Sequence, residues 1–231
     1  MTRTVAFARE QLRAPFTLTL LILVPALFVV AAANALSDFA AALGGALTGD
    51  SAVALGAGWS AAFVAGTLGF FQAASSRGAD RRLALAGLGP RRVALSRLAA
   101  SIGLAVIASA AAFVTLLLRA GVEHPFHAAV GLLAFALLYL SLGVLVGSVV
   151  SAPLEGSLVV VFIFMLDVFS GPGMSESDAP WSVSRKAADV LIAAATGSPS
   201  PASDWISVAV MTAGALVAAL AVFVFSARSR A

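Results

Sequence analysis

The sequence predicts an all-α, polytopic membrane protein with six transmembrane helices. Of its 231 residues, 61% are hydrophobic and 11% are charged, whereas a soluble domain has roughly half and a quarter. Its mean hydropathy is +1.02. The apolar residues fall into six segments, and no polar stretch between them reaches the roughly 50 residues of a separate domain. We therefore expect one transmembrane domain over residues 1–231.

The chain is expected to begin with a short amphipathic helix on the membrane surface. In residues 1–13, apolar residues recur at helical spacing while Arg9 and Arg13 lie off that stripe. Residues 14–33 follow as the first span, because about 20 apolar residues cross a hydrocarbon core. Pro25 lies inside this span and predicts a kink. A secretory signal peptide is the alternative, although its apolar region of about 7–15 residues is usually shorter.

Five further spans complete the prediction, and in two of them small residues at four-residue spacing include glycines. The six spans are expected at residues 14–33, 52–75, 98–118, 128–150, 153–169 and 205–225. The small residues are Gly58, Ala62 and Gly66 in the second span and Gly143 and Gly147 in the fourth. Small side chains at this spacing let membrane helices approach closely. We therefore expect these five residues to be helix-packing positions.

Residues 170–203 form the longest segment between two predicted spans. An apolar stripe from Val183 to Ala195 lies within it and is too short to cross a membrane. We expect a helix there that lies in the interface or dips into the membrane as a re-entrant segment. Trp181 and Trp205 flank this helix as interfacial anchors.

The charge distribution predicts that both termini are cytoplasmic. Six arginines lie between the second and third spans: Arg77, Arg81, Arg82, Arg91, Arg92 and Arg97. Most of the 14 basic residues fall on that side together with the termini, whereas residues 34–50 contain acids but no base. We expect residues 34–50 to be an external loop with a short helix that ends at Gly44 and Gly45. The excess of arginine on one side favours this orientation by the positive-inside rule.

No complete catalytic motif is present in the sequence. A P-loop requires a lysine followed by serine or threonine, and Lys186, the only lysine, has no such context. The absence of cysteine excludes thiolate chemistry and cysteine metal sites. His124 and His127 could bind a metal, but solvated histidines at an interface are commoner. The arginine segment has no interleaved aromatic residue, which disfavours nucleic-acid binding. We expect no enzyme activity, resident metal or cofactor in this chain.

Asp167 is the one ionisable residue well inside a predicted span. It lies 14 residues after Pro153, which corresponds to about 21 Å along a helix. Ionisable residues in spans are costly and often mark a substrate or proton path. The alternative is a structural ion pair with Arg119, Arg185 or Lys186 near the outer surface. Both interpretations are open at this stage.

The order of these elements resembles that of the ABC-2 type transporter permeases, the membrane subunits of bacterial ATP-binding-cassette exporters. Residues 78–92, GADRRLALAGLGPRR, are similar to the family's coupling segment, in which a charged glycine-leucine stretch precedes a Pro-x-Arg sequence. Residues 143–172 are similar in having a short turn before the fifth helix and a Gly-Pro exit after it. The chain differs in carrying arginines where many members have glutamates, with Asp80 as its only acid there.

The resemblance implies a transport subunit in the plasma membrane that is powered by a separate ATPase, which would bind the ATP and magnesium. Two permease copies, identical or related, would pair in the lipid bilayer and export amphipathic or lipid-like molecules. The ATPase would contact the segment between spans two and three, at Asp80, Arg81, Arg82, Leu83, Leu85, Leu88, Arg91 and Arg92. The alternatives are a proton-coupled secondary transporter that uses Asp167 and a structural membrane anchor.

Overall fold

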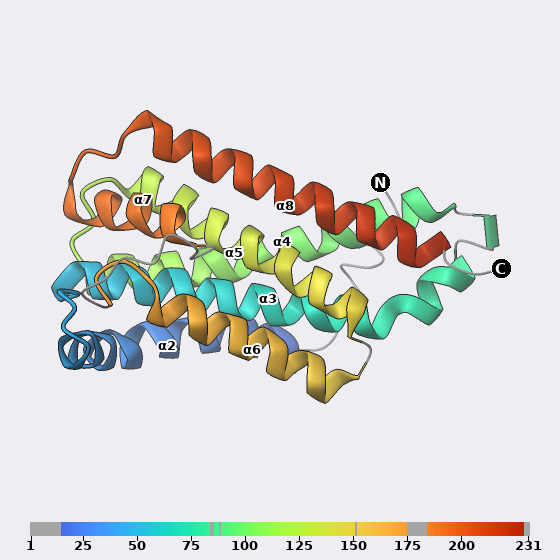
Figure 1. Cartoon of the computed structure of the whole chain (residues 1–231), viewed down its shortest axis with the longest axis horizontal. Coiled ribbons are helices and arrows are strands. Elements are labelled where there is room, and N and C mark those ends of the chain that lie inside the picture. The colour runs from blue at the N-terminus through green and yellow to red at the C-terminus, as the bar shows by residue number, and fades with distance from the viewer. Residues whose placement is uncertain (1–14, 84–85, 88, 151, 175–183, 229–231) are drawn as a thin grey trace.

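The computed structural model describes residues 15–83, 86–87, 89–150, 152–174 and 184–228. Within these ranges the chain forms seven α-helices and no β-strand, which confirms the all-helical prediction. The helices are α2 (Pro15–Ala42), α3 (Gly49–Leu83), α4 (Pro90–Arg119), α5 (Pro125–Val149), α6 (Pro153–Phe169), α7 (Arg185–Thr196) and α8 (Ala202–Arg228). The long helices lie side by side in an elongated bundle (Figure 1). The predicted helix at residues 1–13 lies outside the described residues.

Proline marks where several helices begin. Pro90, Pro125 and Pro153 each stand in the first turn of a helix, after a residue with non-helical backbone angles. The first amide groups of a helix have no intrahelical acceptor, so proline loses no hydrogen bond there, and its fixed φ suits the helix. The prolines therefore set the starts of α4, α5 and α6.

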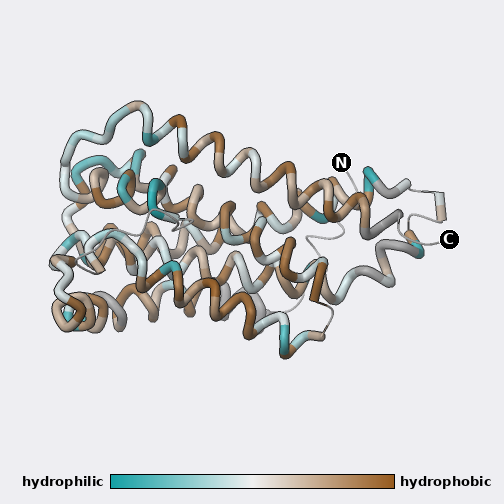
Figure 2. Tube along the Cα trace, viewed as in Figure 1, coloured by the Kyte–Doolittle hydropathy of each residue, from teal (hydrophilic) through white to brown (hydrophobic). Residues whose placement is uncertain are grey.

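Four of the described helices are long and apolar enough to cross a membrane: α3, α4, α5 and α8. Hydrophobic residues predominate along the bundle, while hydrophilic residues gather toward its two ends (Figure 2). Helix α6 has 17 residues, or about 25 Å of length, which is less than the roughly 30 Å of a hydrocarbon core. The described residues thus contain four candidate spans, or five if α2 is included, against the six predicted.

Helix α2 extends into the region where an external loop was predicted. Its two parts, Ile22–Ala31 and Asn34–Ala42, meet at an angle of 50°. The second part occupies residues assigned from the sequence to the loop, so the expected short helix is a continuation of α2. This bend lies between Ala31 and Asn34, and the kink at Pro25, which lies inside α2, stays a prediction.

Most of the described part of the arginine segment is helical, although the sequence predicted that it lies between two spans. Helix α3 continues to Leu83 and α4 begins at Pro90, well beyond the predicted span limits at residues 75 and 98. Gly87 and Gly89 have φ values of 94° and 73° in the turn, a region that residues with a side chain rarely occupy. The hairpin extends beyond the α5–α6 turn at the same end of the bundle (Figure 1). We call it the arginine hairpin, residues 77–97.

Helices α3 and α5 approach closely at their glycines. A methyl group added at Gly143 would lie 2.8 Å from the carbonyl carbon of Gly66 and 2.9 Å from the amide nitrogen of Phe70. At Gly147, an added methyl group would lie 2.5 Å from the Phe70 carbonyl oxygen. Such distances are shorter than van der Waals contact, so only glycine allows the two backbones to meet here. Ala62 is fully buried on the same helix as Gly66.

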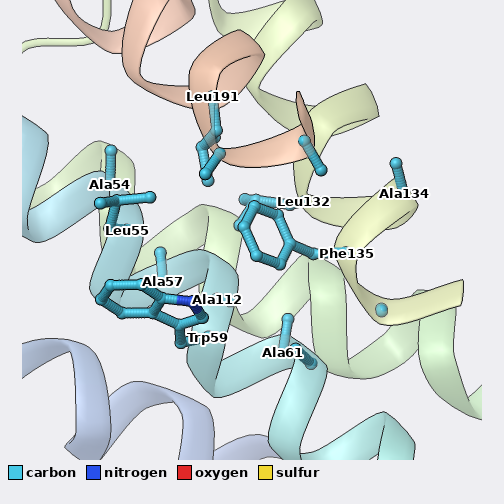
Figure 3. Close-up of a cluster of buried hydrophobic side chains, with 14 of the residues drawn as sticks. Ala54, Leu55, Ala57, Trp59, Ala61, Ala112, Leu132, Ala134, Phe135 and Leu191 are labelled. Atoms are coloured by element: carbon cyan, nitrogen blue, oxygen red, sulfur yellow. The ribbon is translucent and has the colours of Figure 1, made fainter. Parts of the chain in front are cut away.

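Helix α7 packs into one end of the bundle against α3, α5 and α8. Its Leu191 is fully buried and points toward Phe135 on α5 (Figure 3). An added methyl group at Gly58 on α3 would lie 2.9 Å from Leu191 Cδ2 and 3.0 Å from Phe135 Cε2. Gly58 thus provides room for the side chain of α7, whereas Gly66 provides room for the backbone of α5.

Candidate functional site

The arginine hairpin has a well-defined register between its two helices. The side chains of Gln72 on α3 and Ser101 on α4 are hydrogen-bonded at 2.5 Å. Further from the hairpin, Leu104 and Ala108 on α4 pack in one cluster with Val64 and Leu68 on α3. These contacts show that α3 and α4 are antiparallel. Each residue further toward the C-terminus of α3 is therefore level with a residue further toward the N-terminus of α4.

The register places the arginines in two layers. Counting from the Gln72–Ser101 pair, Arg77 is level with Ser96, and therefore with its neighbour Arg97. We call Arg77 and Arg97 the inner layer. By the same count, Arg81 and Arg82 are level with Arg92 and Arg91, and these four residues form the outer layer. At 1.5 Å per residue the layers are about 8–9 Å apart along α4.

The outer layer is exposed to solvent where its side chains are described. Arg82, Arg91 and Arg92 are exposed, and Leu83 beside them is half-buried. Asp80 and Arg81 belong to the last turns of α3, and Leu85 and Leu88 lie outside the described residues. Exposed guanidinium groups at the tip of a projecting hairpin are accessible to a soluble, acidic partner.

Asp167 is 2% exposed and is hydrogen-bonded to two other elements. The phenol of Tyr139 on α5 donates to Asp167 Oδ2 at 2.6 Å, and the backbone N–H of Ser184 donates to Oδ1 at 3.3 Å. Ser184 immediately precedes α7. The carboxylate therefore lies at the N-terminus of α7, where the helix dipole favours negative charge. The Tyr139 partner, 28 residues away, could not be identified from sequence spacing.

Two of the cations considered as partners for Asp167 make contacts elsewhere. Lys186 Nζ lies 2.9 Å from Asp204 Oδ1 and 3.7 Å from Asp189 Oδ2. The Arg119 guanidinium donates to the Val30 carbonyl oxygen at 3.4 Å. The hydrogen bond to Asp204 is the largest cause of the raised Lys186 pKa. This ion pair joins the start of α7 to α8.

An apolar groove of about 300 Å³ lies between α5 and α8. Leu133 and Leu137 line it from α5, and Trp205, Ala209 and Ala213 line it from α8. Trp205 Nε1 donates to Ser200 Oγ at 2.8 Å, which fixes the indole at one end of the groove. An apolar groove between two long helices can hold the hydrocarbon part of an amphipathic molecule.

The two histidines are neighbours but do not form part of a larger ligand cluster. The ring centroids of His124 and His127 are 5.6 Å apart, and His127 also contacts Trp205. Among the described residues, no three His, Cys, Asp or Glu side chains are grouped so as to hold a metal.

Comparisons with protein-family models, with curated proteins and with solved structures give no match to this chain.

Proposed function

We propose that the chain is the membrane permease subunit of an ATP-driven exporter of the ABC-2 type, with six spans and both termini in the cytoplasm of a plasma membrane. The arginine hairpin is the observation that carries this proposal. Its outer layer projects beyond the α5–α6 turn and presents exposed guanidinium groups, while the sequence contains no P-loop that could hydrolyse ATP. A separate ATPase subunit that holds ATP and magnesium would bind there.

The cargo proposed for this permease is amphipathic or lipid-like. The apolar groove between α5 and α8 supports this class, because its described lining is almost entirely hydrocarbon. A second permease copy, identical or related, would complete the transporter. Closure of two ATPase subunits would then shift the permease pair between its two access states, and partner binding and cargo binding would be reciprocally coupled.

A proton-coupled transporter that uses Asp167 is the main competing function. The contacts of Asp167 favour a structural role instead, since its two oxygens accept hydrogen bonds from α5 and from the residue before α7. We therefore retain the ATP-driven function.

Reconstitution into vesicles tests the proposal. We expect efflux of an amphipathic fluorescent dye only when a co-purifying ATPase and hydrolysable ATP are both present. The double variant R91Q/R92Q should lower this efflux several-fold by weakening ATPase association. R119Q, at the other end of the same helix, is the matched control and should leave association unchanged. Dye efflux driven by a pH gradient without nucleotide would support the proton-coupled alternative.

A further inference from the structure

The apolar groove between α5 and α8 is bounded at both ends. The two helices begin at the same end of the bundle and run in the same direction (Figure 1). His127 in the first turn of α5 contacts Trp205 in the first turn of α8, with ring centroids 5.2 Å apart. Further along, Val144 on α5 packs in one cluster with Ala219 and Phe223 on α8. These two contacts set the length of the groove.

The groove is about as long as one leaflet of a bilayer is deep. Its lining on α8 runs from Trp205 to Leu216, which is about 16 Å along a helix. A hydrocarbon core of about 30 Å gives each leaflet about 15 Å. Between these residues, Ala209 and Ala213 line the groove with short side chains, opposite Leu133 of α5. A volume of about 300 Å³ over this length is narrow, so the groove suits a single hydrocarbon chain that lies along the helices.

Aromatic rings are gathered at the Trp205 end of the groove. His127 also contacts His124 and Phe126, at centroid distances of 5.6 and 6.0 Å. The Trp205 N–H donates to Ser200 Oγ, so the indole presents ring carbons and not its polar atom to the groove. The faces of aromatic rings carry partial negative charge and attract organic cations within about 6 Å. This end therefore suits a cationic head group better than an anionic one.

The charge at this end of the bundle also favours a cation. Helices α2 and α4 end here, and α3, α5 and α8 begin here (Figure 1). Apart from the buried Asp167, the described side chains at this end include five acids and three bases, which are Asp38, Asp50, Glu123, Asp189 and Asp204, and Arg119, Arg185 and Lys186. The excess of acids attracts cations and repels anions that approach the groove.

We propose that this groove binds a single-chain amphiphile with a quaternary ammonium head, its chain along α8 and its head beside Trp205. A quaternary ammonium group has no N–H donor to satisfy. This property fits a described lining whose only hydroxyl group, on Thr212, is buried. The identification of this molecule as the exported cargo rests on the proposed function, whereas its binding does not.

Binding to the full-length protein in phosphatidylcholine nanodiscs tests the site. Radiolabelled dodecyltrimethylammonium is titrated, and its binding to empty nanodiscs is subtracted. We expect saturable binding that A213L lowers several-fold, because leucine fills the groove. A221L makes the same change on the same helix and is the matched control, since Ala221 is exposed and lies outside the described lining. It should bind the probe as the wild-type protein does.

Two variants of Trp205 test the contact with the head group. We expect W205L to lower the affinity for dodecyltrimethylammonium about five-fold, because it removes the aromatic face. W205F keeps an aromatic face and should lower the affinity by less than about two-fold. This pair also decides the question should A213L fail to fold. Equal losses in W205L and W205F would show that the ring does not hold the cation.

Competition with dodecyl sulfate, which has the same chain and an anionic head, tests the charge preference. We expect unlabelled dodecyltrimethylammonium to displace the probe and dodecyl sulfate to displace it much less. Equal displacement would overturn the proposal, because the groove would then recognise only hydrocarbon. The absence of saturable binding, or an equal loss in A221L and A213L, would overturn it as well. None of these measurements uses an ATPase or ATP, so their failure is distinguishable from a failure of ATP-driven export.

Discussion

Tyr139 on α5 and Asp167 on α6 are joined by a buried hydrogen bond of 2.6 Å. Because Asp167 also accepts the N–H of Ser184, a single carboxylate connects α5, α6 and the start of α7. Tyr139 packs in addition against Gly66, where α3 and α5 meet. The pair thus links the most closely packed contact of the bundle to the short helix α7.

Removal of the Tyr139 hydroxyl tests the structural role of this bond. We expect Y139F to lower the free energy of unfolding by roughly 0.5–2 kcal/mol, since side-chain hydrogen bonds between membrane helices contribute values in this range. Thermal unfolding in detergent measures the change. D167N is the matched variant, and its side-chain amide oxygen still accepts one hydrogen bond. If the role of Asp167 is structural, D167N should therefore lower the free energy of unfolding by less than Y139F does. Abolished transport by a fully stable D167N protein would instead indicate a proton or substrate site.

Gly143 allows a prediction about helix packing with an internal control. We expect G143A to destabilise the bundle by about 1–3 kcal/mol, because the new methyl group overlaps the backbone of α3 at Gly66 and Phe70. An added methyl group at Gly103 on α4 or Gly214 on α8 meets no atom within 4 Å. G103A and G214A should therefore be neutral or up to about 1 kcal/mol more stable, since alanine favours a helix. Equal destabilisation in all three variants would show that the close contact between α3 and α5 is unimportant.

Lys186 gives a prediction for alkaline pH. Its pKa lies above the ordinary value of 10.5 in the folded protein, chiefly because of its hydrogen bond to Asp204. A raised folded-state pKa means that the pair stabilises the fold below pH 10.5 and that this contribution is lost as pH rises through the folded-state pKa. The melting temperature should therefore fall more steeply above pH 10.5 in the wild-type protein than in K186M. Parallel pH profiles for the two proteins would argue against this ion pair.

The sequence predicts the helical class and several helix starts because these features are local. Helix α6 starts at Pro153, and the Gly-Pro pair follows its last residue, Phe169. The limits of this helix are therefore those of the predicted apolar segment. At the arginine hairpin they do not coincide. Arginine is a good helix former, and α3 continues through Arg81 and Arg82 to Leu83, beyond the predicted span limit at residue 75. Hydropathy therefore predicts the limits of the apolar segment and not the last residue of the helix.

The contacts of the candidate site are less predictable, because they are tertiary. Nothing in the sequence around Asp167 indicates that Tyr139 would be its partner, or that Lys186 would contact Asp204 on α8. Both pairings depend on how α7 packs into the end of the bundle. The glycine spacing, in contrast, was visible in the sequence, although it did not specify which helix each glycine would meet.

Cross-linking from the arginine hairpin tests the central claim most directly. Ala86 is exposed in the turn between α3 and α4, so a photoreactive amino acid placed there should capture any protein that docks on the hairpin tip. A matched probe at Gly121, exposed between α4 and α5 at the far end of α4, is the control. The account predicts that the Ala86 probe alone captures a soluble ATPase, identified by mass spectrometry, and that R91Q/R92Q lowers the yield. Capture of no ATPase at Ala86, by a protein that still transports its cargo, would contradict it.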